Sequence, residues 1–153
     1  MKKSATLSAD GLYRYTLQRC WDEDKPRVFF ICLNPSTADA EDDDKTVRRI
    51  IGFARDWGFG GVLIGNLFAL RSRDPSALYK SADPVGPDND MYLRQMAEQS
   101  ELIVAAWGNH GRYLKRSDVV RKMFPMKCLY VNCTGEPRHP LYVAEDEQLK
   151  DYA

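Results

Sequence analysis

Short apolar runs alternate with stretches of helical spacing along the whole chain. Residues 11–21 alternate bulky and polar side chains, which predicts a half-buried strand or hairpin. Residues 27–33 are almost entirely apolar, which is typical of a central strand covered on both faces. Further buried strands are predicted at 62–64, 102–106 and 127–132.

Segments whose apolar residues recur at helical spacing lie between these apolar runs. Apolar residues recur at that spacing over residues 44–57, and Gly58 and Gly60 follow in the manner of a helix carboxyl terminus. A second helix is expected to open at Pro87. A third is expected over 117–124, with Ser117 and Asp118 as its cap.

Strands that alternate with helices predict an α/β fold, a three-layer sandwich with a mostly parallel central sheet. The chain has 153 residues, and no repeat or linker divides it. We therefore expect a single domain over 1–153, with its core at 27–143. The charged tail at 144–153 is expected to be a short surface helix or a frayed end.

Composition and charge narrow the classes of function. Lys and Arg total 22, and Asp and Glu also total 22, so the net charge does not favour non-specific binding to a nucleic-acid backbone. The balance is compatible with a basic patch on one face of the protein. No apolar run reaches the roughly 18 residues of a membrane helix, and residues 1–7 lack the apolar stretch of a secretory signal. The four cysteines have no metal-site spacing, so free thiols and a cytoplasmic location are expected.

Polar or unusual residues follow each core strand. They are Asn34, Asn66, the pair Trp107 and Gly108, and, in the loop after the last strand, His139. Ligands of open α/β sheets bind at the carboxyl ends of the strands, so these residues are predicted to converge on one rim. Taken singly, each has an ordinary alternative: turn residues for the asparagines, a core position for the indole, a loop histidine.

The start of the first helix carries candidate polar contacts. Asp44 lies at the predicted cap and Thr46 in the first turn, where a helix amino terminus favours anions. Arg48 and Arg49 point in different directions, so at most one faces the site. The acidic run at 39–44 is expected to face solvent, and a metal site there is the alternative.

Other basic residues allow two interpretations. Arg71 and Arg73, past the second strand end, are suited to clamp phosphate or carboxylate, or else belong to a solvated loop. The bases scattered over 112–122 form a nucleic-acid contact or a solvated helix face.

Five short motifs in combination are distinctive: Leu33 to Asp39, Asp44 to Arg49, Gly65 to Ala69, Ala106 to Gly108 and His139 to Leu141. They resemble an uncharacterised family of small prokaryotic and phage proteins, over nearly the whole chain. That resemblance implies a fold but no activity.

The order of the motifs is also similar to that of the uracil-DNA glycosylase superfamily. Asn34 matches the loop after the first core strand, Asn66 the base-reading asparagine, Gly108 the strand-end glycine and His139 the late loop. The chain departs from that pattern at Leu33 and Ser36, which replace glycines, and at Leu141, which replaces a serine; no aspartate stands in the water-activating position.

The second resemblance implies roles for individual residues. Asn34 would position the attacking water or the sugar, and Asn66 would read the edge of a flipped base. His139 would stabilise negative charge on the departing base, and Trp107 or Phe68 would stack on it.

The resulting hypothesis is a nucleobase- or nucleotide-recognising enzyme of glycosylase-like fold, with N-glycosidic cleavage of a modified or damaged base as its reaction. The alternatives are a non-catalytic base-binding module and a metal-dependent enzyme of phosphate chemistry. No cofactor, resident metal or membrane partner is expected, and the partner is a nucleobase, a nucleotide or a nucleic acid. The predicted catalytic residues are Asn34, Asp44 and His139; the predicted substrate-binding residues are Ser36, Thr37, Thr46, Arg48, Asn66, Phe68, Arg71, Trp107 and Gly108.

Overall fold

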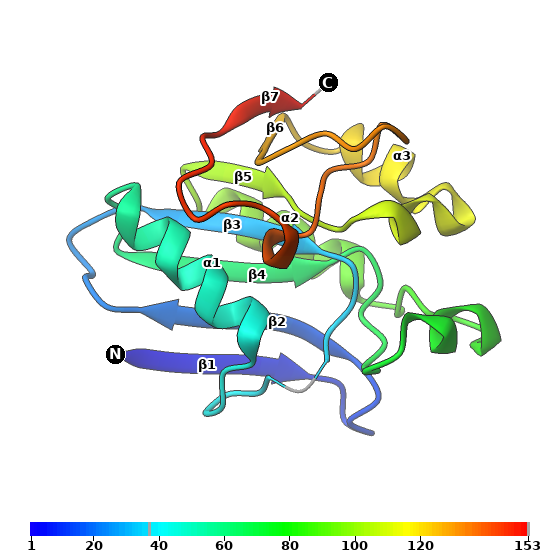
Figure 1. Ribbon diagram of the computed structural model, residues 1–153. Helices are drawn as coiled ribbons and strands as arrows, with labels where there is room; N and C mark the ends of the chain where they lie inside the picture. The colour runs from blue at the N-terminus through cyan, green and yellow to red at the C-terminus, as the bar shows by residue number, and fades with distance from the viewer. Residues whose placement is uncertain (37, 153) are drawn as a thin grey trace.

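The computed structural model describes residues 1–36 and 38–152. Within them the chain forms one seven-stranded sheet in the order β1-β2-β4-β3-β5-β6-β7 (Figure 1). The strands are β1 (Lys2–Leu7), β2 (Arg14–Cys20), β3 (Arg27–Cys32), β4 (Gly61–Asn66), β5 (Leu102–Ala105), β6 (Met126–Cys128) and β7 (Lys150–Tyr152). The helices are α1 (Lys45–Asp56), α2 (Asn89–Glu98), α3 (Arg116–Arg121) and the 3-10 helices η1 (Pro75–Lys80), η2 (Asn109–Lys115) and η3 (Pro140–Tyr142).

The sheet is mixed, which corrects the expectation of a mostly parallel one. Strand β3 pairs in parallel with β4 and β5, and β5 pairs in parallel with β6. The outer pairs, β1 with β2, β2 with β4 and β6 with β7, are antiparallel. The short connection between β1 and β2 forces an antiparallel hairpin, because a parallel pair needs a long crossover. The α/β class itself is confirmed.

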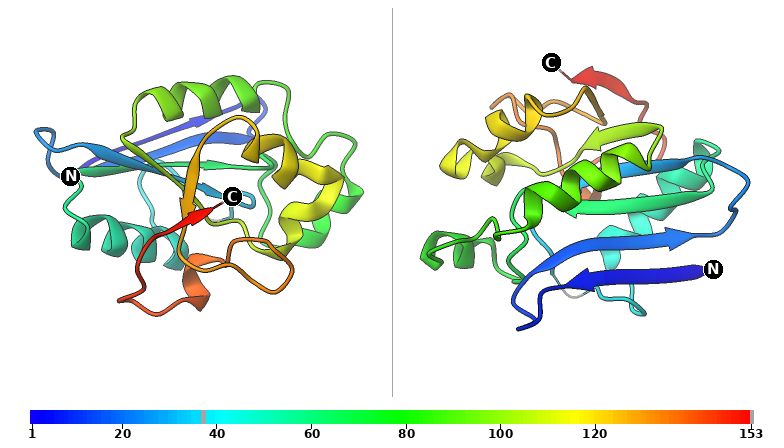
Figure 2. Two further views of the ribbon diagram at one scale, coloured as in Figure 1. Left: turned by 90° about the horizontal axis from the view of Figure 1, so that it is seen from above. Right: turned by 180° about the vertical axis from the view of Figure 1, so that it is seen from behind.

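Helices cover both faces of the sheet and give the expected three layers. Figure 2 shows the sheet between α1 on one side and α2 on the other. Phe30 and Cys32 of β3 pack in the apolar core beneath α1, whereas Phe29 and Ile31 pack in the core beneath α2 and α3. Strand β3 is therefore apolar on both faces, which accounts for its unbroken apolar run.

Several element boundaries differ from those expected. The tail forms β7, where Tyr152 packs edge-on against Trp107 with ring centroids 6.0 Å apart, and not a helix or frayed end. Ser117 does not cap the third helix, because its hydroxyl donates to Glu136 at 2.9 Å. Strand β6 ends at Cys128, short of the predicted 127–132. Strand β1 was not predicted at all.

Two further observations concern the helices and the cysteines. None of the helices in the described part of the chain has the length and apolarity needed to cross a bilayer. The four cysteines are free thiols, three of them buried and one, Cys133, exposed.

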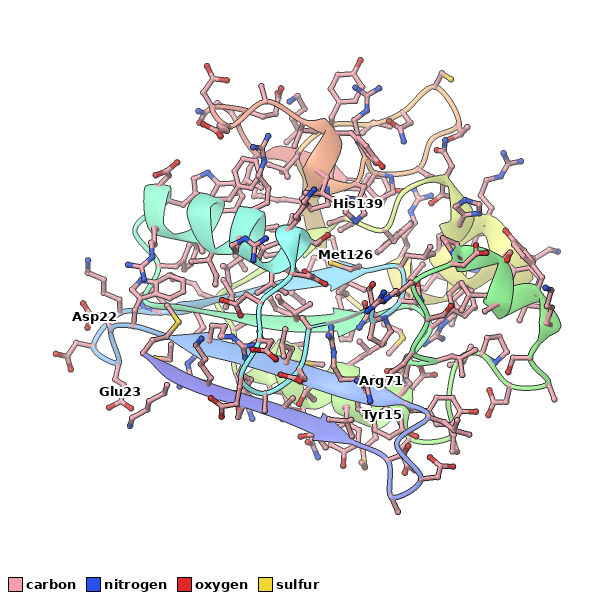
Figure 3. All side chains as sticks on the ribbon, turned by 60° about the horizontal axis from the view of Figure 1, so that its bottom comes forward. Tyr15, Asp22, Glu23, Arg71, Met126 and His139 are labelled. Atoms are coloured by element: carbon pink, nitrogen blue, oxygen red, sulfur yellow. The ribbon has the colours of Figure 1, made fainter. Side chains whose placement is uncertain are left out.

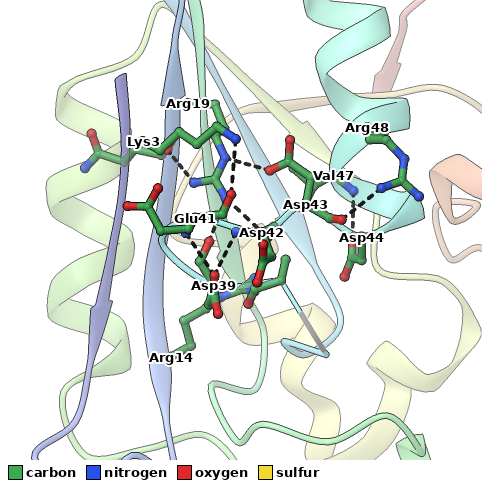
Figure 4. Close-up of polar contacts among 12 residues, drawn as sticks. Lys3, Arg14, Arg19, Asp39, Glu41, Asp42, Asp43, Asp44, Val47 and Arg48 are labelled. Carbon is green, nitrogen blue, oxygen red and sulfur yellow. Dashed lines mark hydrogen bonds and ion pairs between the residues drawn. The ribbon is translucent and has the colours of Figure 1, made fainter. Parts of the chain in front are cut away.

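The acidic run is folded around one buried arginine (Figure 4). Arg19, with no exposed surface, donates from Nε to the Asp43 carboxylate at 2.7 Å and from a terminal nitrogen to the Asp39 carbonyl oxygen at 2.6 Å. The Asp39 carboxylate in turn accepts from the backbone N–H groups of Glu41 and Asp42. In residues 1–36 and 38–152 no three metal-ligating side chains cluster. The acidic loop is held in place by Arg19 and leads into α1.

This network predicts a stability effect. Replacing Arg19 with Met removes the donor of the Asp43 carboxylate and of three backbone carbonyl oxygens, so the free energy of unfolding is expected to fall by about 2–3 kcal/mol in urea denaturation. Lys2→Met is the control, because the Lys2–Glu23 pair is exposed and its loss should leave stability unchanged. Equal stability of the two variants would contradict a central role for Arg19.

Candidate functional site

The topology fixes where a ligand is expected. From β3 the chain passes through α1 to the neighbouring strand β4, then crosses back through α2 to β5 on the other side of β3. The crevice between the carboxyl ends of β3 and β5 is therefore the switch point at which open α/β sheets bind ligands. A cavity of about 740 Å³ lies at these strand ends. This volume is within the range of small-molecule sites.

Most of the predicted site residues line this cavity. They come from five separate segments of the chain, namely the loop after β3, the start of α1, the end of β4, the end of β5 and the loop before η3. The lining residues among them are Asn34, Ser36, Asp44, Thr46, Asn66, Trp107, Gly108 and His139. The residues predicted to converge on one rim therefore line the same cavity. Thr37 lies outside the described residues.

Three predicted residues lie elsewhere. Phe68 is fully buried in the core beneath α2, with its ring centroid 5.9 Å from that of Tyr113. Arg48 is exposed on α1 and donates to the Asp43 carbonyl oxygen at 2.9 Å. Arg71 donates to the Gly11 carbonyl oxygen at 3.3 Å, and it is Arg73 that lines the cavity.

Trp107 borders the cavity, but its ring belongs to the core. The side chain is 1% exposed, and its Nε1–H donates to Glu136 Oε2 at 2.6 Å. A Cβ on Gly111 would lie 2.2 Å from the indole, so the ring is also tightly covered. The indole thus has the contacts of a core residue and not those of a stacking surface.

Gly108 joins the end of β5 to the late loop. Its φ of +77° is a left-handed conformation that favours glycine. The Gly108 N–H donates to the Pro137 carbonyl oxygen at 2.8 Å, which draws the segment before His139 across the strand end. His139 thereby lies beside the start of α1 (Figure 3), where η3 contacts that helix.

Asn66 is the most unusual residue of the cavity. It is 1% exposed, yet neither its Oδ1 nor its Nδ2 has a hydrogen-bond partner among the described residues. Its backbone carbonyl oxygen is satisfied, because it accepts from Asn89 Nδ2 at 2.9 Å. Buried amides in proteins are normally paired, since an unpaired donor or acceptor costs about 1–3 kcal/mol. The side chain therefore offers a ligand an amide NH₂ donor group and a carbonyl oxygen acceptor.

Asn34 has a partly structural role. Its Nδ2 donates to the carbonyl oxygen of Ser72 at 3.0 Å and to that of Pro35 at 3.2 Å, which fastens the loop after β4 to the loop after β3. The turn interpretation therefore applies to the amide nitrogen. Since that nitrogen is engaged, Oδ1 is the part of Asn34 that is suited to a ligand or water.

His139 presents a proton donor to the cavity. Its Nδ1 accepts from the Leu141 N–H at 3.1 Å, so the neutral ring carries its proton on Nε2. Burial lowers the pKa of His139 below its ordinary 6.5, and the charge of Asp44 opposes this shift. The ring is consequently neutral at neutral pH.

Asp44 caps α1 and lies close to several charged groups. Its Oδ1 accepts from the Val47 N–H at 2.9 Å, as the predicted cap requires. Its charge acts on both His139 and Arg14. Cys32, also in the cavity wall, is no nucleophile, because burial raises the pKa of its thiol to about 12.

Arg14 is a cavity residue that sequence reasoning missed. It is 3% exposed and donates to the Ala38 carbonyl oxygen at 2.7 Å, while its Nε has no partner among the described residues. Burial lowers its pKa to about 10, so the guanidinium stays protonated at neutral pH. Its position in an alternating strand gave no signal of this placement.

Fold and site together define a doubly wound α/β protein with a cavity at its strand ends. The chain belongs to the family described as protein of unknown function (DUF1643), which it matches over residues 14–141. The family resemblance drawn from the sequence motifs is thereby confirmed. No curated protein and no solved structure matches, so the likeness to the uracil-DNA glycosylase superfamily is not confirmed.

The state of His139 gives a spectroscopic prediction. The chain has two histidines, and the ring that loses its NMR signals in His139→Asn is expected to titrate below 6.5 with its neutral proton on Nε2. Because the folded pKa is the lower one, this ring stabilises the fold above 6.5, and that contribution is lost as the pH falls through the folded pKa. His139→Asn, which keeps an acceptor for Leu141, should flatten this acid-side loss. A titration above 6.5 would contradict the assignment.

Proposed function

We propose that the cavity binds a nucleobase and that the protein cleaves the N-glycosidic bond of its substrate. The observation that carries the proposal is the buried, unpaired amide of Asn66. An amide side chain matches the edge of a base, where a donor and an acceptor stand side by side. A ligand without that pair would leave a buried group unsatisfied, so the same residue supports selectivity.

His139 supports the cleavage step. When the C1′–N bond breaks, its electron pair leaves with the base, and the negative charge is stabilised by a hydrogen bond from the Nε2–H. The neutral ring is suited to this task, because its Nε2 already carries the proton that the hydrogen bond needs. The resemblance to the glycosylase superfamily, carried by Asn34, Asn66, Gly108 and His139, points to the same chemistry.

The remaining groups serve the attacking water. Water forms the new bond to C1′ and gives up one proton, which the Asp44 carboxylate is suited to accept. The free Oδ1 of Asn34 orients that water. The departing base anion takes up the proton that the water released, so the products are the neutral free base and the sugar with a hydroxyl at C1′.

A second candidate function is base recognition without cleavage. It is favoured by the bonds from Asn34 Nδ2 to backbone carbonyl oxygens, since a residue that fastens two loops need not take part in a reaction. Binding of bases without any release from nucleosides, nucleotides or modified oligonucleotides would select this candidate.

The two buried asparagines form a matched pair for testing binding. Asn66→Leu removes an unpaired amide, so the ligand-free protein should be as stable as the wild type or more stable by about 1 kcal/mol, while base binding is lost. Asn89→Leu removes donors to the carbonyl oxygens of Asn66 and Leu67 and should lower stability by about 1–3 kcal/mol.

The measurement is thermal denaturation with and without a panel of bases and nucleosides, in which ligand binding raises the transition temperature. If no base stabilises the wild type, or if Asn66→Leu keeps the same response, the proposed recognition is wrong.

Turnover tests the role of His139. His139→Ala should reduce base release by about 100- to 1,000-fold, because one donor to the departing anion is lost. The affinity for the free neutral base should change little. The substrate is the one that the binding panel selects, and the released base is measured by chromatography. If His139→Ala releases base as fast as the wild type, His139 has no role in the mechanism.

A further inference from the structure

Arg14 is a buried cation that lacks a carboxylate partner. Among the described residues no carboxylate oxygen lies within ion-pair distance of its guanidinium, which has only one hydrogen bond, to the Ala38 carbonyl oxygen. The other two deeply buried arginines, Arg19 and Arg116, each have an aspartate partner, Asp43 and Asp90 respectively. An isolated buried charge is strongly unfavourable unless something compensates it.

A local irregularity turns Arg14 toward the cavity. Thr6 pairs with Thr16, but Leu7 pairs with Arg14, so Tyr15 is an extra residue in β2. Leu17 of the same strand packs beneath α1, and strict alternation from it would turn Arg14 to the opposite face. The bulge reverses that direction, and bulges of this kind commonly aim side chains into functional sites.

The cavity wall as a whole is basic. Arg73 and Arg138 line it together with Arg14, whereas Asp44 is the one carboxylate among the described lining residues. The chain has no net charge, so this local excess is a property of the site. Positive groups around a low-dielectric cavity attract an anionic ligand.

We propose that the substrate is a free nucleotide whose terminal phosphate binds Arg14 while its base binds Asn66. This inference rests on the proposed function and deepens it by naming the substrate class. A guanidinium presents several donors to phosphate oxygens in a planar fork. Because Arg14 is 3% exposed, a small ligand that enters the cavity reaches it, whereas a phosphodiester within a continuous strand would need an open groove.

The reaction then has defined products. Water adds to C1′, the C1′–N bond breaks, and one nucleotide and one water give a free base and a sugar phosphate. The phosphate stays on the sugar throughout, so Arg14 binds it in substrate and product alike. In this scheme Arg14 is a binding residue.

Isothermal titration with matched ligands tests the proposal. Nucleoside 5′-monophosphates are compared with the corresponding nucleosides, with inorganic phosphate and with short single-stranded oligonucleotides, on the wild type and on Arg14→Met. The monophosphate is expected to bind the wild type more tightly than its nucleoside. Arg14→Met should lower the affinity for the monophosphate by about 10- to 100-fold and leave the affinity for the nucleoside unchanged.

Two controls separate binding from folding. Arg94→Met removes an exposed arginine from α2, on the other face of the sheet, and should change no affinity. Arg14→Met removes a buried charge that has no ion-pair partner, together with one hydrogen bond to the Ala38 carbonyl oxygen, so it should lower the stability of the ligand-free protein less than Arg19→Met does. Arg14→Lys should restore part of the monophosphate affinity.

The outcomes distinguish this inference from the proposed function. If nucleosides and monophosphates bind with equal affinity, or if Arg14→Met lowers both affinities equally, the phosphate site is wrong and base recognition still holds. Phosphate binding that depends on Arg14, without any base binding, would overturn the proposed function and keep the anion site. Tight binding of oligonucleotides but not of monophosphates would overturn the assignment to a free nucleotide.

Discussion

The pairing of β3 with its two parallel neighbours holds the site together. It continues past the strand ends, where the N–H groups of Leu67 and Phe68 donate to the carbonyl oxygens of Cys32 and Leu33. On the other side of β3, the Ala106 N–H donates to the carbonyl oxygen of Ile31 at 2.8 Å. Segments that are far apart in sequence are thereby fixed at one edge of the sheet, and the positions of the cavity residues follow from this register.

The site opposes the stability of the fold that supports it. Asn66 keeps a donor and an acceptor unpaired in the interior, and Arg14 keeps a charge there. Each such group destabilises the folded state by an amount comparable with the effect of a typical harmful mutation. Two apolar cores, one on each face of the sheet, offset that loss. Polar groups that break the ordinary rules of burial are expected at functional sites, where a ligand supplies the missing partners.

The sequence was informative wherever one local rule decided the outcome. Apolar runs marked the central strands, helical spacing marked α1, and the strand-end rule predicted that Asn34, Asn66 and His139 would converge. It was uninformative where tertiary pairing decided. Nothing local shows that the tail pairs with β6 or that a bulge turns Arg14 inward. Phe68 follows a strand as closely as the cavity residues do, yet it packs into the opposite core, because the direction of a side chain past a strand end depends on the loop.

Asp44 raises a question of charge balance within the proposed site. A carboxylate in the cavity repels an incoming anion and opposes the burial that keeps His139 neutral. Two features weaken that repulsion. The carboxylate accepts the Val47 N–H at the start of α1, where the helix dipole favours negative charge, and the Arg14 cation lies near enough for the two charges to interact. With Asp44 compensated in this way, the neutral imidazole and the guanidinium groups of the cavity wall are the donors available for the anionic ligand that we propose.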